Sequence, residues 1–439
     1  MPADFKQHAQ QVFDAQKANF LAGTTRDHDF KIAQLKKLRS AILEHKERIY
    51  VAMEHDLGRD REGVDLGEIN PVLHEIDFSI ENLSKWEAEE QVPSAGPSDD
   101  TENSIKREGY GVSYIVVPFN YPVQLFAGPL IGAIIGGNTA IIKPSEATPE
   151  TSKVIEDIVS ATFESNYIHV FQGAREENEF LLSLPFDLIF FTGSPQVGKI
   201  VMAAAARHLT PVILELGGKS PAIIMEDADL DSTVEELVFA RMLNSGQTCV
   251  APDYLYVHEK VKDALVGKLK KAVAERYSQA GNNGKIITQR QFDVLEQMLA
   301  RTDGTIVFRG ESDRERRHFG PAIVDNVGFE DSLMEVELFA PIYPVLTFND
   351  ASEVAQTVNR YHPKPLAAYV FSADIENAKR LLDEIPAGDV GVNAMMLHVF
   401  NPHLPFGGVG TSGLGQYHGK YSYEAFTHPK SYRVRQLRG

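Results

Sequence analysis

The sequence predicts an α/β protein built on a doubly wound parallel β-sheet, and two observations support this fold class. Short apolar segments typical of buried strands alternate with helix-like segments through the middle of the chain. Several of these apolar segments end in Gly, Pro or Asn, which are the residues that turn a strand toward a helix. The length of 439 residues favours two or three domains with a sizeable core.

Helices are expected before the sheet begins. Residues 4–22 and 28–57 look helical, with polar residues along one side. The next helix is indicated by apolar residues at alternating steps of four and three, namely Ile69, Leu73, Ile76, Ile80 and Leu83. This stripe predicts a core-packed helix that begins near Pro71 and runs past Trp86.

The sheet is expected after a Pro/Ser/Asp-rich stretch at residues 92–103, which is typical of a loop or an excursion. Strands are then expected in the segments SYIVV, TAIIKP, NYIHVFQG, FDLIFFTG and PVILELGG, with a helix in QVGKIVMAAAARHL before the last. Residues 109–142 carry no charge and imitate a membrane span. Glycines, Pro129 and Asn138 interrupt that stretch, so it predicts a buried strand, loop, helix and strand and no membrane span.

Composition excludes several classes of protein. The chain has 43 basic and 61 acidic side chains, and its formal charge of −18 makes nucleic acid and anionic membranes improbable partners. The basic C-terminal segment RVRQLRG is expected to be a solvated tail or an intersubunit contact. A single cysteine rules out disulfides and cysteine-rich metal sites, and no secretory signal is evident, so we expect a cytoplasmic protein.

Other candidate sites are weak. The nearest histidine pair, His398 and His403, lacks helical spacing, so no metal site is expected. The acidic run EDADLD near residue 226 lacks the pattern of a calcium loop, and a helix N-cap is expected there. The turn FFTGSPQVG is a candidate anion site before a helix, although an ordinary tight turn explains it equally well. PFGGVGTSGLG at residues 405–415 is interpreted as a structural loop near a site.

Seven segments, in order and spacing, resemble the signature segments of the aldehyde dehydrogenase superfamily. They are PFNYP (118–122), NTAIIKPSE (138–146), FTGSPQVG (191–198), LELGGKSP (214–221), NSGQTCVAPDY (244–254), EVELFAPI (335–342) and NPHLPFGG (401–408). The APDY after the cysteine and the short N-terminal region look most like the class 3 branch. The resemblance implies that the protein oxidises an aldehyde with NAD or NADP. It also implies a homodimer.

The same resemblance implies a Rossmann-like cofactor domain, an α/β catalytic domain and a small bridging domain. We expect residues 1–91 and 104–214 in the cofactor domain and residues 215–405 in the catalytic domain. Residues 92–103 and 406–439 would form the bridging, oligomerisation segments.

The residues of these segments support the chemistry. A thiolate is a nucleophile that can later leave, and Cys249 is the only candidate in the chain. Glu215 lies between two leucines of an apolar strand, where an unpaired charge is costly, so a functional role as general base for thioester hydrolysis is favoured. The resemblance implies that the Asn120 amide and the Cys249 N–H hold the oxyanion, although Asn120 also fits a plain turn.

The resemblance also implies the binding residues. Lys143 and Glu146 would meet the adenine ribose of NAD, which favours NAD over NADP unless Glu146 points to solvent or caps the next helix. The remaining cofactor residues would be Phe119, Gly193, Ser194, Gly198, Glu337 and Phe339. An aldehyde tunnel, for a hydrophobic or aromatic substrate, would include Tyr121, Met242 and Phe406, each of which also fits ordinary core.

Two departures and two alternatives accompany this hypothesis. Ala340 stands where the family usually has Gly, so that turn would be strained if it needed a positive φ. Phe119 replaces a common Trp, and both changes are expected to alter cofactor fit. The alternatives are an acylating, coenzyme A-dependent relative, against which Glu215 counts, and a non-catalytic derivative, which would be expected to lose Cys249 or Glu215.

Overall fold

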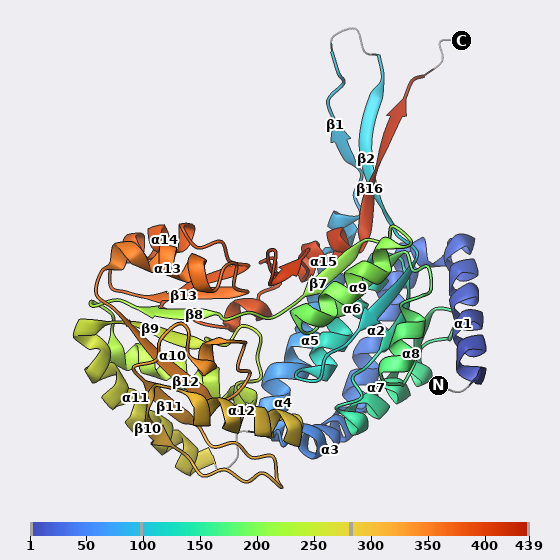
Figure 1. Ribbon diagram of the computed structural model, residues 1–439. Helices are drawn as coiled ribbons and strands as arrows, with labels where there is room; N and C mark the ends of the chain where they lie inside the picture. The colour runs from blue at the N-terminus through green and yellow to red at the C-terminus, as the bar shows by residue number, and fades with distance from the viewer. Residues whose placement is uncertain (1–2, 97–99, 281–283, 437–439) are drawn as a thin grey trace.

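The computed structural model describes residues 3–96, 100–280 and 284–436. Two lobes lie side by side, and a narrow arm projects from the lobe that contains the N-terminus (Figure 1). Each lobe is built on its own β-sheet, and the arm is a third, smaller sheet.

The first lobe holds a six-stranded sheet in the order β15-β7-β6-β3-β4-β5. Its strands are β3 (Val112–Val116), β4 (Thr139–Lys143), β5 (Ile168–Val170), β6 (Leu188–Thr192), β7 (Val212–Glu215) and β15 (Gly413–Leu414). All neighbours are parallel except β15, which is antiparallel to β7. The chain winds outward from β3 in one direction and from β6 in the other, so the strand order reverses between these two strands. The predicted doubly wound fold is confirmed.

Helices cover both faces of this sheet. One face is covered by α6 (Pro122–Ile135) and α7 (Pro149–Thr162), on which α2 (His28–Glu44), α3 (Lys46–Leu57) and α5 (Asn70–Trp86) pack in turn. The other packs on α1 (Ala3–Ala22), α8 (Arg175–Leu181) and α9 (Pro195–Ala206). The N-terminal helices lie within the predicted ranges, but residues 28–57 form two helices that are divided at His45. The striped helix, predicted to run past Trp86, ends at that residue.

The uncharged stretch of residues 109–142 forms β3, α6 and β4, as predicted. Helix α6 is apolar all round because both of its sides are buried. Its first N–H groups, from Val123 and Gln124, donate to the carboxylate of Glu68 at 3.0 and 2.8 Å, so a buried acid caps the helix. Across the described ranges, no helix is long and apolar enough to cross a membrane.

The second lobe holds a seven-stranded sheet in the order β10-β11-β12-β9-β8-β13-β14. Its strands are β8 (Pro221–Ile224), β9 (Tyr254–His258), β10 (Thr305–Arg309), β11 (Ala322–Asp325), β12 (Ile342–Phe348), β13 (Ala367–Phe371) and β14 (Asp389–Val392). Its helices are α10 (Leu230–Met242), α11 (Glu259–Ala280), α12 (Gln289–Arg301), α13 (Val354–Tyr361) and α14 (Ile375–Asp383). Asp229 of the acidic run accepts the N–H of Asp231 at 3.0 Å and caps α10, which confirms the predicted N-cap.

The arm consists of β1 (Glu90–Val92), β2 (Glu102–Gly109) and β16 (Thr427–Val434), paired antiparallel. The division into domains stays a prediction, but the sheets place residues 413–425 with the first lobe. In that segment β15 pairs with β7, and α15 (Gly419–Ala425) packs on α5 and α6. Residues 97–99 and 437–439 of the predicted bridging segments lie outside the described residues.

Candidate active site

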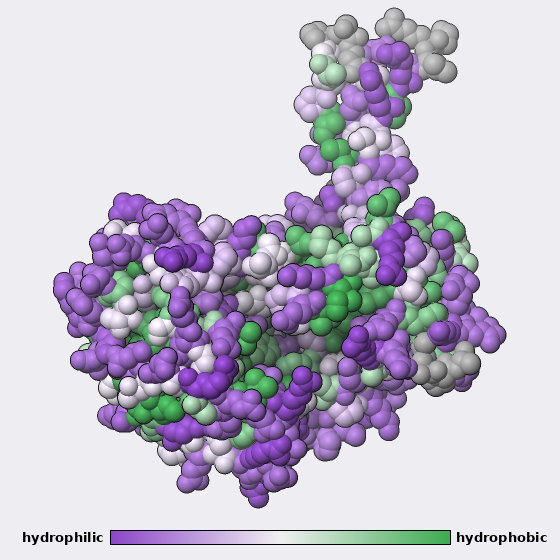
Figure 2. Space-filling model, viewed as in Figure 1, coloured by the Kyte–Doolittle hydropathy of each residue, from purple (hydrophilic) through white to green (hydrophobic). Residues whose placement is uncertain are grey.

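A cavity of about 460 Å³ opens at the carboxyl ends of β3, β4, β6 and β7, where the strand order reverses. Doubly wound sheets bind ligands at this position because their strand-to-helix turns meet there. The space-filling view shows apolar surface in the hollow between the two lobes (Figure 2). Ten of the predicted site residues line the cavity: Phe119, Asn120, Lys143, Glu146, Gly193, Ser194, Glu215, Cys249, Glu337 and Phe339.

The segment before Cys249 has an unusual backbone. Asn244, Ser245 and Gly246 all have positive φ, at 50°, 55° and 72°. A side chain at Gly246 would approach the Ala340 carbonyl oxygen to 2.5 Å, so this turn needs a glycine for both conformation and space. Such strain persists only where surrounding contacts fix the backbone.

Those contacts come from two amide side chains. Gln247 Nε2 donates to the Lys285 carbonyl at 2.9 Å, and its Oε1 accepts the Ile287 N–H at 3.0 Å. Asn244 Nδ2 donates to the carbonyl of Asn120 at 2.9 Å. The turn that carries Cys249 is therefore fastened both to the second lobe and to the turn after β3.

Cys249 itself is half-buried at the wall of the cavity. Burial raises the pKa of the thiol, and the negative charges of Glu337 and Glu215 raise it further. The thiol is therefore protonated at neutral pH in this arrangement, and it needs a base to become a nucleophile.

Asn120 lies beside this turn and is buried. Its Nδ2 donates to the carbonyl of Gln247 at 3.1 Å. This hydrogen bond fixes the Asn120 amide against the turn that carries Cys249. An amide nitrogen carries two hydrogens, so a second donor position remains for a ligand oxygen.

Glu215 ends β7 and is almost fully buried. Within the described part of the chain, neither of its carboxyl oxygens has a hydrogen-bond partner. Burial raises the pKa of Glu215 well above its ordinary value, and the nearby charge of Asp389 raises it further. A buried, unpartnered acid in a cavity is a candidate for proton transfer, because no structural contact explains it.

Lys143 and Glu146 lie together at the end of β4. Lys143 Nζ donates to Glu146 Oε2 at 2.6 Å, with the lysine side chain 5% exposed and the glutamate 58% exposed. Partial burial would raise the pKa of Glu146, but the hydrogen bond from Lys143 and a backbone hydrogen bond outweigh it, so the pKa is lowered. Glu146 is therefore held as a carboxylate at the rim of the cavity.

Glu337 lines the cavity from the segment between β11 and β12. A Cβ at Gly217 would overlap its carboxylate, so the glycine after β7 makes room for this side chain. Burial and the charge of Asp253 raise the pKa of Glu337 to about 8. The ring of Phe339 meets Phe119 edge to face, with centroids 5.9 Å apart.

A buried ion cluster fixes the segment that carries Glu337. Lys219 pairs with Asp253 and donates to the carbonyls of Leu333 and Val336 at 2.9 and 3.0 Å. Arg241 also pairs with Asp253, at 3.0 Å. Lys219, the lysine of the LELGGKSP segment, is therefore a structural residue that fixes the segment carrying Glu337.

Four predicted site residues do not line this cavity. Gly198 lies in α9, where a Cβ would approach the Leu216 side chain to 2.7 Å, so it serves helix-to-strand packing. Met242 is buried in the core at the end of α10. Phe406 is buried among rings, with Tyr417 and His418 at centroid distances of 5.7 and 5.8 Å.

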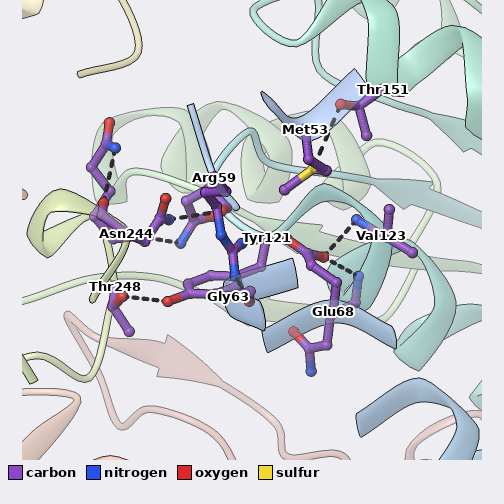
Figure 3. Close-up of polar contacts among 12 residues, drawn as sticks. Met53, Arg59, Gly63, Glu68, Tyr121, Val123, Thr151, Asn244 and Thr248 are labelled. Carbon is purple, nitrogen blue, oxygen red and sulfur yellow. Dashed lines mark hydrogen bonds and ion pairs between the residues drawn. The ribbon is translucent and has the colours of Figure 1, made fainter. Parts of the chain in front are cut away.

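Tyr121, the fourth of these residues, contacts the turn that carries Cys249. Its hydroxyl hydrogen-bonds Thr248 Oγ1 at 2.8 Å, and the Arg59 guanidinium lies 4.7 Å from its ring centre (Figure 3). Arg59 also pairs with the buried Glu68 at 2.7 Å. Tyr121 therefore positions the residue next to Cys249.

Some cavity residues were not predicted. Ser145, Asn178, Thr192 and Gln291 add polar groups to the walls. Thr192 and Ser145 lie inside segments already singled out, at the ends of β6 and β4, and their position was a usable signal. Asn178 and Gln291 lie in helical regions with no distinguishing pattern.

The strain that was expected if Ala340 had a positive φ does not arise, because Ala340 is not among the residues with positive φ. The residue before it, Phe339, has a φ of 50°.

The walls suit a dinucleotide. Ser194 caps the N-terminus of α9, which opens on the cavity, and free N–H groups there attract phosphate. Lys143 adds a cation, the Thr192 hydroxyl is buried without a described partner, and Gly217 leaves space beside Glu337.

Comparisons with known proteins agree with this geometry. A model of the aldehyde dehydrogenase family matches residues 2–432. The chain is 43% identical to 4,4'-diaponeurosporen-aldehyde dehydrogenase of Staphylococcus aureus, over 98% of this chain and 94% of that protein. It is 37% identical to the dimeric NADP-preferring aldehyde dehydrogenase of Canis lupus familiaris, over 97% and 94%.

Other relatives, from mouse and cattle, are named aldehyde dehydrogenase family 3, in line with the class 3 resemblance. A solved structure of the substrate-bound state of Staphylococcus aureus AldH superposes with a TM-score of 0.95 at 42% identity, covering 98% of this chain and 94% of that one.

Proposed function

Because the chain belongs to the aldehyde dehydrogenase family and resembles its class 3 branch, we propose that it oxidises aldehydes through an acyl-enzyme on Cys249, with Glu215 as general base. The observation that carries this proposal is the placement of Cys249 and an unpartnered, buried Glu215 in one cavity. An ordinary structural role explains neither group.

The first step forms a carbon–sulfur bond. The Cys249 thiol loses its proton to water in the cavity, and the thiolate attacks the aldehyde carbon to form a thiohemiacetal. The second Asn120 amide hydrogen and the Cys249 N–H would hold the oxyanion that develops. Because burial raises the pKa of the thiol, a ligand or a base must favour the thiolate when substrate binds.

Four residues of the cavity would hold NAD(P), which accepts a hydride when bound and so leaves a thioester on Cys249. Lys143 and Glu146 would contact the adenine ribose, Ser194 at the start of α9 the pyrophosphate, and Glu337 the nicotinamide ribose. Phe339 and Phe119 would form the apolar wall beside the ring.

The second half of the reaction is hydrolysis. Water attacks the thioester carbon, Glu215 takes one proton from that water, and the carbon–sulfur bond breaks with the thiolate as leaving group. Glu215 can take this proton only in its ionised form, and its raised pKa makes that carboxylate a stronger base. An acylating relative that uses coenzyme A in place of water would have no use for this base.

The substrate we propose is a hydrophobic or aromatic aldehyde. The lining of the cavity includes the apolar side chains of Val117, Leu216 and Ile287. An apolar substrate chain is suited to such a wall. The name of the Staphylococcus aureus relative, whose substrate is a diaponeurosporen aldehyde, supports this class.

For the cofactor we propose a preference for NAD. Glu146 is a carboxylate at the cavity rim, where the extra phosphate of NADP would meet it. Lys143 neutralises part of this charge, so we expect a preference of about tenfold or more in kcat/KM at one ionic strength. Glu146→Gln should reduce that preference. Parity between the cofactors in the wild-type enzyme, or no change in the variant, would contradict the proposed role of Glu146.

The proposed function is tested by following the absorbance of reduced cofactor with NAD and a panel of aldehydes, with and without coenzyme A. We expect turnover that coenzyme A does not stimulate, fastest with apolar or aromatic aldehydes, and none in Cys249→Ala, which should still bind cofactor. Turnover that requires coenzyme A would favour an acylating enzyme. More than about a tenth of the wild-type rate in Cys249→Ala would remove the nucleophile assignment.

A further inference from the structure

Lys143 and Arg175 are the two cations among the described residues that line the cavity. Lys143 is 5% exposed and donates to Glu146, so a carboxylate already matches its charge. Arg175 differs from it, because its side chain lines the same cavity and is 87% exposed. A guanidinium that faces solvent at the edge of a nucleotide cavity is a potential ligand for phosphate.

Arg175 follows β5, and β5 is the neighbour of β4 in the sheet. The two strands are parallel, and at their ends the Phe171 N–H donates to the Ile142 carbonyl at 2.9 Å. The turns that carry Glu146 and Arg175 therefore leave strands about 5 Å apart. Strand β6, which leads to α9 and the proposed pyrophosphate position, lies on the far side of β4 and β3. Arg175 is thus on the adenine-ribose side of the proposed cofactor site.

The backbone that carries Arg175 is fixed. Arg175 is the first residue of α8, and the Ala174 N–H before it donates to Glu177 Oε2 at 2.9 Å. One turn further along α8, Asn178 Oδ1 accepts the hydroxyl of the buried Tyr114 of β3 at 2.6 Å. Only the side chain of Arg175 therefore needs to move to reach a ligand.

The donors of Arg175 are only partly used. Its Nε donates to Glu179 Oε1 at 2.7 Å, and the Glu179 side chain is 55% exposed. A guanidinium has five N–H donors, and this hydrogen bond leaves the two terminal nitrogens for a phosphate. An exposed ion pair four residues apart contributes little, so it competes weakly with a doubly charged phosphate.

A phosphate on the adenine ribose would meet groups from two turns. The turn after β4 brings the Glu146 carboxylate, which repels it, and the Ser145 hydroxyl, which can donate to it. The turn after β5 brings the Arg175 guanidinium, which attracts it. The attraction by Arg175 offsets part of the repulsion by Glu146, so Glu146 alone does not decide the choice of cofactor.

We propose that Arg175 binds the 2′-phosphate of NADP through its terminal nitrogens, so that the enzyme uses NADP as well as NAD although Glu146 favours NAD. This inference rests on the proposed function for the position of the adenine ribose, but it needs no reaction at Cys249. The contact is an ion pair with hydrogen bonds, so no covalent bond forms and no proton moves.

The test compares NADP with NAD, which differ only in the 2′-phosphate. Isothermal titration calorimetry without aldehyde, at one ionic strength, gives both Kd values for the whole enzyme. In Arg175→Gln we expect the Kd for NADP to rise about tenfold, because charge-assisted hydrogen bonds to the phosphate are lost, and the Kd for NAD to change less than about twofold. The preference for NAD should therefore increase.

Two mononucleotides locate the effect on the adenosine half of the cofactor. 2′,5′-ADP carries the 2′-phosphate, and 5′-AMP is the same molecule without it. Arg175→Gln should weaken the binding of 2′,5′-ADP about as much as that of NADP, and it should leave the binding of 5′-AMP unchanged.

Two further variants serve as controls. Arg175→Lys keeps the positive charge and should retain most of the affinity for NADP. Arg207→Gln is the same change as in the test variant, at an exposed residue just after α9, and should alter neither Kd. Melting temperatures should stay close to that of the wild type, because the substituted side chains are exposed.

The assignment is overturned if the wild-type enzyme binds NAD but not NADP, or if Arg175→Gln changes the Kd for NADP less than about twofold. It is also overturned if the variant loses NAD and NADP equally, which would place the guanidinium on the adenine or on a phosphate that both cofactors carry. An equal effect of Arg207→Gln would show that only the overall charge matters. Failure of the wild-type enzyme to bind either cofactor would instead remove the proposed cofactor site.

Discussion

Cys249 and Glu215 are both placed where their charged forms are disfavoured. Burial raises the pKa of each group, and nearby carboxylates add to the effect. A nucleophile that is protonated at rest is protected from unwanted reaction, and a base with a raised pKa takes a proton from water more readily. The same surroundings make both groups depend on precise support from their neighbours.

Gly217 offers a test of that support for Glu337. In Gly217→Ala the new Cβ would overlap the carboxylate of Glu337, whose side chain borders the cavity and can shift into it. We therefore expect the Kd for cofactor to rise at least severalfold, with little change in melting temperature, as measured by fluorescence titration and calorimetry. Gly218→Ala is the control, because its Cβ would have a nearest contact of 3.4 Å. Equal effects of the two changes would contradict a role for Glu337 in cofactor binding.

Predicted site residues line the cavity where they lie at or just after the end of a strand, and they lie outside it where the side chain packs into the core. Lys143, Ser194 and Glu215 follow parallel strands, whose carboxyl ends meet at one edge. Gly198 and Met242 belong to the same segments or lie near Cys249 in the chain, but they face the core. Nearness in sequence does not determine on which side of a helix a residue lies.

At the scale of elements, the turn from Leu243 to Cys249 is held by contacts from outside itself. Tyr121, at the start of α6, hydrogen-bonds Thr248, and this tyrosine packs under Arg59. Glu68 joins Arg59 to the N-terminus of α6. These buried contacts connect the N-terminus of α6 to the turn that carries Cys249 (Figure 3).

Tyr121→Phe and Thr248→Val test this connection as a double-mutant cycle. Each change removes one partner of the same buried hydrogen bond, so each should lower the free energy of unfolding by about 1 kcal/mol. The double variant should lose little more than either single one, because the partner left unpaired in each single variant is removed. Denaturant unfolding gives these values, and fully additive losses would show that the two hydroxyls act independently.

Most strands and helices of the two lobes are predictable, since buried parallel strands read as apolar runs and helices as stripes. The arm is not. Strand β16 is exposed over most of its length, and β2 is mixed, so neither shows the alternation that marks a strand. Their pairing joins residues more than 300 positions apart, a contact that no local pattern reports.

At the scale of the whole molecule, the arm stands clear of both lobes (Figure 1). Among the described strands β16 lies at an edge of the three-stranded sheet, and it exposes Tyr432 and Val434. An exposed strand edge with apolar side chains is suited to pairing with another chain. We propose that the arm contacts a second copy of this chain and that the enzyme is a homodimer.

Light scattering coupled to gel filtration should give twice the chain mass for the wild-type protein. The double variant Tyr432→Asp and Val434→Asp should dissociate it at micromolar concentration, because two charges would be buried in the contact. Leu209→Asp, an equally drastic change at a residue of the first lobe that is 91% exposed, should leave the dimer intact. A monomeric wild-type protein, or a dimer that survives the arm variant, would contradict this assignment.

The acyl-enzyme on Cys249, hydrolysed with the help of Glu215, is the central claim, and Glu215→Gln tests it most directly. This change keeps the shape of the side chain and removes the base, so the thioester should form and then persist. Intact-mass measurement after mixing the variant with NAD and an aldehyde should show one acyl group per chain on the peptide that contains Cys249, with a burst of about one equivalent of reduced cofactor. A variant that turns over at the wild-type rate, or that shows neither adduct nor burst, would contradict the account.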